Sequence, residues 1–335
     1  MSRRLFLKGS ALLGATAISG ITTLRSAHAQ TTGTMPTVFV MGGHSKPGTS
    51  FSRGLDLIGS RLVKRFGQRI DPRYAYDVEG AGYEGTDMLW LVDSGILSLA
   101  YSTDAGENVP ALDVVALPFL FMNTDEARAA MDGALGRAAI DDIESRTSFR
   151  VLGFFENGFR HLSNSVRPVQ TPTDLSGLSI RVFPAVQEAF RLLGADVVYA
   201  PISETILKLA DGSYDGQENP FENVMGYGMQ AHQQYYTTTY HSYLSRPIFV
   251  HGPTFDAWPE ELQLEIREAV QEAVIEQREL HDIAEIESAA AIREAGGEII
   301  DLTAEQRSEF IATVKPVYAK ARSRYDPELL AAVGL

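Results

Sequence analysis

The feature that most limits the fold is a stretch of 36 residues, Glu260 to Ala295, without glycine or proline. Pro259 precedes it and Gly296-Gly297 follows it, which are typical helix boundaries. Its apolar side chains recur at helical spacing: Leu262, Ile266, Ala269, Ala273, Leu280, Ile283 and Ala284. A continuous helix of this length would span about 54 Å, more than the diameter of a typical domain. We therefore expect it to lie across two lobes as a brace.

The first 29 residues have the composition of an export signal. The basic segment "SRRLFLK" from Ser2 precedes an apolar run, and Ala27-His28-Ala29 has the A-x-A pattern of a cleavage site. The adjacent arginines followed by Phe-Leu-Lys resemble a twin-arginine (Tat) signal. We expect a mature chain that begins near Gln30 and works in the periplasm, with an uncleaved membrane anchor as the alternative. No later apolar run is long enough to span a bilayer.

The composition of the remaining chain excludes several classes of function. Residues 30–335 hold 25 lysines and arginines against 43 aspartates and glutamates, which disfavours nucleic-acid binding. The absence of cysteine excludes disulfides, iron–sulfur clusters, thiolate zinc sites and cysteine nucleophiles. H-E-x-x-H, G-x-S-x-G and Walker-type motifs are also missing, so no cofactor or metal is implied. An enzyme remains possible without its usual signatures.

Two sets of alternating strands and helices follow one another along the chain. The first has strands near 37–41, 74–79 and 96–101, with helices over 50–66 and around 88–91. The second has strands near 151–155, 179–183 and 197–199, with helices over 185–193 and 203–210. This alternation predicts parallel α/β sheets, whose ligand crevice lies beyond the carboxyl ends of the strands. No flexible linker separates the sets, so we expect them to touch and to share strands.

The segment "LSIRVF" places Arg181 inside a run of strand-forming residues. A guanidinium stays protonated at physiological pH, so a buried arginine here needs an anionic partner. An internal glutamate, Glu156, Glu188 or Glu218, could serve as a structural bridge. The other candidate is a bound anion.

Three stretches carry a resemblance to a known family, and the second of them ends with the segment around Arg181. They are "VVALPFLF" from Val114, "GFFENGFRHLSNSVRPVQTPTDLSGLSIRV" from Gly153 and "PISETILKLADGSYDGQENPFENV" from Pro201. In this order they resemble the solute-binding proteins of tripartite ATP-independent periplasmic (TRAP) transporters, the DctP type. The resemblance implies an α/β, two-lobed periplasmic solute-binding fold with a central ligand cleft and a long helix bridging both lobes. We expect lobe I at residues 30–156 plus 245–284, and lobe II at 157–244 plus 285–335.

The resemblance also implies a function and a ligand class. Such proteins capture a small organic acid and deliver it to small and large TRAP membrane subunits for uptake driven by an ion gradient. By resemblance, Arg181 binds the ligand carboxylate, Asn219 positions it, and Arg160 assists directly or braces Arg181. A planar guanidinium suits this task because it donates two parallel charge-assisted hydrogen bonds to a carboxylate.

The residues that recognise the far end of the ligand, remote from the carboxylate on Arg181, are harder to assign. The ligand-facing loops of the first lobe align with His44, Glu84, Tyr101 and Asp104, while Phe183 either stacks on the ligand or fills the core. If the side chains of Glu84 and Asp104 both point into the cleft, they favour a ligand with a hydroxyl or an amine. Arg246 departs from the small or uncharged residue usual at its position, and favours a second carboxylate instead. The sequence leaves this conflict open.

Two other classes of function remain as alternatives. One is an exported lyase or hydrolase that uses the cleft carboxylates and His44 as acid and base. The other is a periplasmic module that presents the same ligand to a receptor. The identity of the acid, the oligomeric state and the involvement of a metal ion do not follow from the sequence.

Overall fold

The computed structural model describes residues 34–103 and 109–335. Within them, nine strands form one mixed sheet in the order β2-β1-β3-β8-β4-β7-β5-β6, and β9 pairs with β8. The strands are β1 (Val38–Gly42), β2 (Asp71–Ala75), β3 (Leu99–Tyr101), β4 (Phe149–Asn164), β5 (Ser179–Arg181), β6 (Asp196–Val198), β7 (Gly216–Asn219), β8 (Tyr235–His251) and β9 (Glu298–Asp301).

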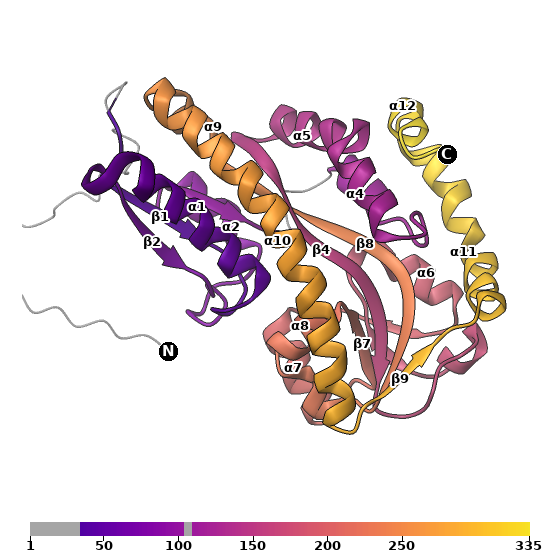
Figure 1. Ribbon diagram of the computed structural model, residues 1–335. Coiled ribbons are helices and arrows are strands. Elements are labelled where there is room, and N and C mark those ends of the chain that lie inside the picture. Colours follow the sequence, from indigo (N-terminus) through magenta and orange to yellow (C-terminus); the bar gives the residue numbers. More distant parts are fainter. Residues whose placement is uncertain (1–33, 104–108) are drawn as a thin grey trace, which may run out of the picture.

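Helices cover the sheet and fill the connections between its strands (Figure 1). They are α1 (Ser50–Phe66), α2 (Asp87–Asp93), α3 (Pro110–Val115), α4 (Thr124–Asp132), α5 (Ala134–Arg146), α6 (Gln187–Leu192), α7 (Ile202–Ala210), α8 (Phe221–Gly226), α9 (Gly252–Asp256), α10 (Glu260–Glu294), α11 (Ala304–Arg324) and α12 (Pro327–Ala331). Short 3₁₀ turns lie at 67–69, 172–175, 184–186 and 229–232.

The long strands β4 and β8 connect the two lobes. They pair antiparallel over most of their length, and run through the centre of the molecule in Figure 1. At one end β3 pairs with β8 and leads to the parallel strands β1 and β2 of the first lobe. At the other end β7 pairs with β4 and leads to the parallel strands β5 and β6 of the second lobe. The expectation that the two sets share strands is confirmed.

Helix α10 is unbroken and contacts both lobes. Its 35 residues span about 52 Å. Near its start Glu265 accepts a 2.7 Å hydrogen bond from Arg61 of α1 in the first lobe. Near its end Glu285 accepts hydrogen bonds from the backbone N–H groups of Phe221 and Glu222 in α8 of the second lobe, at 3.1 and 2.6 Å. The expected brace between the lobes is confirmed.

Among the predicted strands, β4 and β2 differ most from the sequence prediction. β4 extends from Phe149 to Asn164, far beyond the predicted 151–155, because register shifts against β8 absorb its glycines without ending the strand. β2 ends at Ala75, although the prediction placed a strand over 74–79. The chain turns there instead: the Gly80 N–H donates to Asp77 Oδ1 at 2.9 Å, and the Tyr83 N–H donates to the Val78 carbonyl at 3.0 Å.

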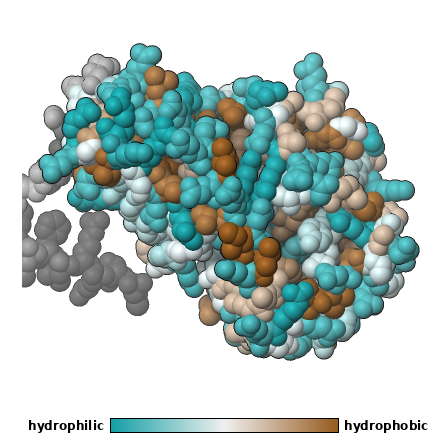
Figure 2. Space-filling view, in the orientation of Figure 1, coloured by the Kyte–Doolittle hydropathy of each residue, from teal (hydrophilic) through white to brown (hydrophobic). Residues whose placement is uncertain are grey.

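The face of the molecule seen in Figure 2 is mainly polar. Figure 2 shows a largely hydrophilic face with scattered hydrophobic residues. The apolar side chains form cores on the sheet, for example Leu55 of α1 and Ile266 and Val270 of α10 in the first lobe. Among the described residues, no helix has both the length and the apolar character needed to cross a membrane.

Candidate ligand-binding site

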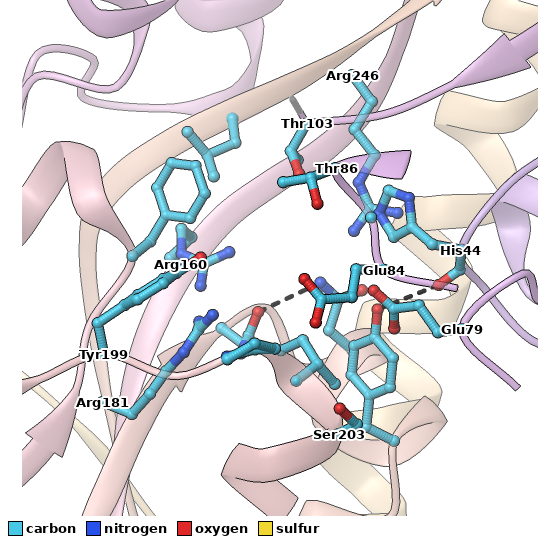
Figure 3. A pocket seen from close by; sticks show the side chains of 18 of the residues that line it. His44, Glu79, Glu84, Thr86, Thr103, Arg160, Arg181, Tyr199, Ser203 and Arg246 are labelled. Atoms are coloured by element: carbon cyan, nitrogen blue, oxygen red, sulfur yellow. Dashed lines mark hydrogen bonds between the residues drawn. The ribbon is translucent and has the colours of Figure 1, made fainter. Parts of the chain in front are cut away.

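A polar cavity lies between the two lobes, with about 850 Å³ of space in and around it that no protein atom fills. The first lobe contributes His44, Glu79, Tyr83, Glu84, Gly85, Thr86 and Thr103. The second lobe contributes Arg160, Arg181, Phe183, Tyr199, Pro201, Ile202, Ser203, Asn219, Asn223 and Tyr227, and strand β8 adds Leu244 and Arg246. Figure 3 shows Arg160, Arg181 and Tyr199 on one side, facing Arg246, His44, Glu79 and Glu84 on the other.

Arg181 lies at the end of β5 and points into this cavity (Figure 3). Its side chain is 5% exposed, its Nε donates to the Ala200 carbonyl at 3.1 Å, and its guanidinium lies 5.3 Å from the centre of the Tyr199 ring. In residues 34–103 and 109–335, no carboxylate oxygen lies within 4 Å of it, so none of the three internal glutamates pairs with it. Burial lowers the pKa of Arg181, an effect that the charge of Glu218 opposes.

Arg160 has a protein partner, in contrast to Arg181. Its Nε and Nη2 both donate to the carboxylate of Glu218, which also accepts a 2.7 Å hydrogen bond from the Phe183 N–H and contacts His241 Nε2 at 3.1 Å. Burial alone would raise the pKa of Glu218, but Arg160 and His241 outweigh it and lower the pKa to about 2. The Arg160 guanidinium, 5.6 Å from the Phe183 ring centre, still lines the cavity.

Asn219 lies beside the two arginines, at the end of β7. Its Nδ2 donates to Gln217 Oε1 at 2.5 Å, and its Oδ1 accepts a 3.4 Å hydrogen bond from Asn223 Nδ2. These bonds fix the amide at the cavity wall while leaving one of its two N–H donors for a ligand oxygen.

The wall of the first lobe is formed by the loops after β1, β2 and β3. His44 is buried, and burial together with the charge of Arg246 lowers its pKa well below the usual range, so its ring is neutral. Its carbonyl accepts a 3.2 Å hydrogen bond from the Tyr227 hydroxyl of the second lobe. Glu84 is exposed, whereas Glu79 is half-buried. Burial raises the pKa of Glu79 to about 7. The charge of Arg246 opposes this rise, and the charge of Asp77 adds to it.

The structure brings seven of the nine predicted site residues to this cavity: Arg181, Asn219, Arg160, Phe183, His44, Glu84 and Arg246. Tyr101 does not line it. Its side chain is fully buried, with its ring 5.4 Å from that of Phe51 and 5.5 Å from that of His44. Asp104 lies outside the described residues.

Sequence reasoning missed several residues of the cavity wall: Glu79, Thr86, Thr103, Tyr199, Ser203, Asn223 and Tyr227. For Glu79 a signal existed, because it follows the first lobe's second strand and such loops form the crevice. The others are common residues in loops and helix starts, with no pattern that separates them from solvated ones. Among the described residues, no cluster of three or more His, Asp or Glu side chains could hold a metal ion.

Apart from the residues that line the cavity, a buried carboxylate connects the two lobes. Glu222 of α8 accepts hydrogen bonds from the N–H and the hydroxyl of Ser50, at the start of α1, at 2.8 and 2.9 Å. His281 of α10 lies 2.9 Å from the same carboxylate, and Gln277 donates to the Ser50 hydroxyl at 3.2 Å. A helix N-terminus of one lobe therefore binds a carboxylate of the other, supported by the brace helix.

We expect the pair of His281 and Glu222 to make stability depend on pH. Burial alone would lower the pKa of His281, but Glu222 and nearby Glu285 and Glu156 raise it to about 9. Because this folded-state value exceeds the unfolded value of about 6.5, the added stability is complete below pH 6.5 and is lost as the pH rises through 9. Relative to His281→Asn, the wild-type free energy of unfolding in urea should fall by roughly 2–3 kcal/mol between about pH 6.5 and 10. Parallel pH profiles for the two proteins would show that His281 is not charged in the folded state.

Known proteins share this fold and this sequence pattern. The family described as bacterial extracellular solute-binding protein, family 7 (DctP) matches residues 81–324. A solute-binding protein of Verminephrobacter eiseniae is 29% identical over 276 residues, which cover 81% of each chain. TRAP periplasmic solute-binding proteins from Chromohalobacter salexigens with bound D-glucuronate and from Xanthobacter autotrophicus with bound β-D-galacturonate are 26% and 25% identical, with TM-scores of 0.81 and 0.79. Each comparison covers 88% of this chain and 97% of the other.

The family match covers most of the chain, and the matched structures have the same two-lobed fold. The resemblance read from the sequence is confirmed: the chain belongs to the DctP family of TRAP solute-binding proteins, family 7 of the bacterial extracellular solute-binding proteins.

Proposed function

We propose that the chain is the solute-binding component of a TRAP transporter and captures a small hydroxylated organic acid in the periplasm. It delivers the acid to small and large membrane subunits that use an ion gradient for uptake. The family membership supports this function. The twin-arginine pattern of residues 1–29, which lie outside the described residues, supports export by that route.

The unpaired guanidinium of Arg181 is the observation that carries the proposal. It is buried, it lines a cavity between two lobes, and no carboxylate within the described residues lies within 4 Å of it. A buried charge without a partner is costly, and a ligand carboxylate supplies that partner with two parallel hydrogen bonds. Asn219 donates to the same carboxylate. Arg160, oriented by Glu218, adds a third donor group on the same wall.

The remaining lining supports a ligand that carries hydroxyl groups. Glu79 and Glu84 can accept hydrogen bonds from hydroxyls, and Thr86, Thr103 and Ser203 can donate or accept them. The two similar structures hold glucuronate and galacturonate, which are hydroxylated monocarboxylates. A sugar acid of this size fits both observations.

Closure around the ligand requires a hinge, which we place where β4 and β8 change register. The shift between Glu156 and Gly158 lies opposite Ser245 and Leu244. Gly158 has a φ of +77°, and a Cβ there would lie 2.2 Å from His281 Nε2, so only glycine fits. These positions support the predicted lobes, 30–156 with 245–284 and 157–244 with 285–335. Because α10 contacts both lobes, closure involves a modest rotation.

An exported enzyme remains the alternative class. The family and its structural relatives are binding proteins. Acid–base catalysis would need a titrating group within hydrogen-bond reach of the ligand. Among the described residues that line the cavity, Glu79 is a carboxyl whose pKa is raised toward neutrality, so it is the candidate for this role. Recovery of the acid unchanged after prolonged incubation with the protein supports binding, whereas a chemically altered acid supports catalysis. A sensing role would instead require a receptor that recognises the loaded protein.

The conservative variant Arg181→Lys tests how the carboxylate is held. Lysine keeps the charge but loses the two-pronged donor geometry, so the affinity for the acid should fall at least tenfold, about 1.4 kcal/mol or more. The acid is first found by a thermal-shift screen of organic, sugar and amino acids, since a ligand stabilises the folded state by mass action. Calorimetric titration of both proteins then gives the ratio. An affinity within about twofold of wild type means that charge alone holds the carboxylate.

A further inference from the structure

Arg246, like Arg181 and Arg160, is a buried arginine on the cavity wall, and it lies opposite Arg181 (Figure 3). It is 3% exposed, and across the described part of the chain no carboxylate oxygen lies within 4 Å of it. Its Nη1 donates to Ser45 Oγ at 3.2 Å, and its guanidinium lies 3.9 Å from the centre of the Phe51 ring. The face of the Phe51 ring attracts the positive charge, but the ring carries no negative charge that could neutralise it. This cation is therefore held in place without being neutralised.

Glu79 points into the cavity from the same side as Arg246 (Figure 3). Within the described residues its carboxylate makes no hydrogen bond. The charges of Arg246 and Arg181 favour its ionised form, while Asp77 and Glu84 of its own loop oppose it. His44 from the loop after β1 is neutral, and burial raises the pKa of Tyr227 from the second lobe to about 12.

The charge of Glu79 changes what the far end of the cavity can accept. When Glu79 is ionised it balances Arg246, and a second ligand carboxylate would lie beside a like charge, which is unfavourable. A hydroxyl group could instead donate to Glu79. When Glu79 is protonated, Arg246 is unbalanced and a ligand carboxylate can neutralise it, with the Glu79 hydroxyl as a further donor. Burial gives Glu79 a pKa of about 7, so both forms are present near neutral pH.

We propose that Arg246 and Glu79 form a charge-selective position for the far end of the ligand, where protonated Glu79 admits a second carboxylate and ionised Glu79 selects a hydroxyl. The proposal rests on the proposed function, because the far end is defined by a first carboxylate on Arg181. It also explains how an acidic side chain and Arg246 can lie at the same end of the cavity, because each ligand preference holds in one protonation state of Glu79.

Galactarate and galactonate test the proposal, since they differ in one terminal group, a carboxylate or a hydroxymethyl. Their carboxyl groups are ionised at both about pH 6 and about pH 8, so the acids themselves do not titrate between these values. The affinity of galactarate, measured by calorimetry, should fall about tenfold from pH 6 to pH 8, as the protonated fraction of Glu79 falls. The affinity of galactonate should change by less than about threefold.

Two variants separate the roles of the two residues. Glu79→Gln should bind galactarate with an affinity independent of pH, and Arg246→Gln should lose the preference for galactarate over galactonate that the wild type shows at the lower pH. Glu188→Gln is the matched control, because Glu188 pairs with Lys320 on the surface of the second lobe, and it should keep the wild-type pH dependence. Thermal unfolding checks that each variant is folded.

The outcomes distinguish this proposal from the proposed function. If the wild type binds no carboxylate in the screen, both fail. If an acid binds in an Arg181-dependent manner but the ratio of galactarate to galactonate affinity is the same at both pH values, or is unchanged in Glu79→Gln, only the charge-selective position fails. Failure of galactarate to bind at pH 6 where a monoacid binds also contradicts it.

Discussion

Replacing Arg181 with alanine should reduce the affinity for the cognate acid at least a thousandfold while the protein stays folded. The substitution removes two charge-assisted hydrogen bonds and leaves the ligand carboxylate buried beside an incomplete set of donors. Truncating one partner of such a pair costs about 4 kcal/mol or more, which corresponds to a thousandfold. Calorimetric titration gives the affinity, and thermal unfolding without ligand gives the stability.

Arg191→Ala is the matched control for this variant. Arg191 is an exposed arginine of the same lobe that donates to Gln187 at 2.9 Å and does not line the cavity. Its removal should leave the affinity within about twofold of wild type. If Arg181→Ala also binds within about tenfold of wild type, the carboxylate is held elsewhere. If the variant unfolds and the wild type binds no carboxylate, Arg181 has a structural role.

Replacing Glu218 with alanine should destabilise the fold by about 3–5 kcal/mol. Glu218 is fully buried and pairs with Arg160, whose side chain is 4% exposed. Without the carboxylate, the guanidinium of Arg160 remains buried with no counter-charge, which is the most costly way to break such a pair. Urea unfolding near pH 7 measures the loss, since the lowered pKa of Glu218 keeps it ionised there.

The double variant Glu218→Ala, Arg160→Met separates the buried charge from general damage to the core. Removing both charges should recover part of the lost stability, because no unpaired ion then remains. Glu188→Ala, which breaks a 2.6 Å pair with Lys320 in which the Glu188 side chain is 43% exposed, should cost less than about 1 kcal/mol. A loss below 1 kcal/mol in Glu218→Ala would mean that Arg160 reaches solvent or another anion.

Local patterns were sufficient to predict the brace helix and the position of Arg181. The Gly- and Pro-free stretch after Pro259 determines a helix without reference to the rest of the fold. An arginine in a strand-forming run signals a need for an anion, and the structure places it at a cavity. The path of β4 could not be read in the same way. Its glycines look like breaks locally, and only pairing with β8, some 90 residues later, keeps the strand continuous.

The pairing of charged side chains was the second feature that could not be predicted from the sequence. Glu218 is one of the three glutamates that the sequence offers as partners of Arg181, but in the structure it pairs with Arg160 instead. Tyr101 was expected in the ligand-facing loop, yet its ring is buried under the cavity wall beside Phe51. Such outcomes depend on side-chain directions in adjacent strands, which alternate residue by residue, so a small error in register reverses them.

The most direct measurement of the central claim is a crystal structure of the protein with its cognate acid bound. We expect one ligand carboxylate to accept two hydrogen bonds from the Arg181 guanidinium at roughly 2.7–2.9 Å, with Asn219 donating to the same group. A ligand whose carboxylate lies elsewhere, or an Arg181 paired with a protein carboxylate in the complex, would contradict the account.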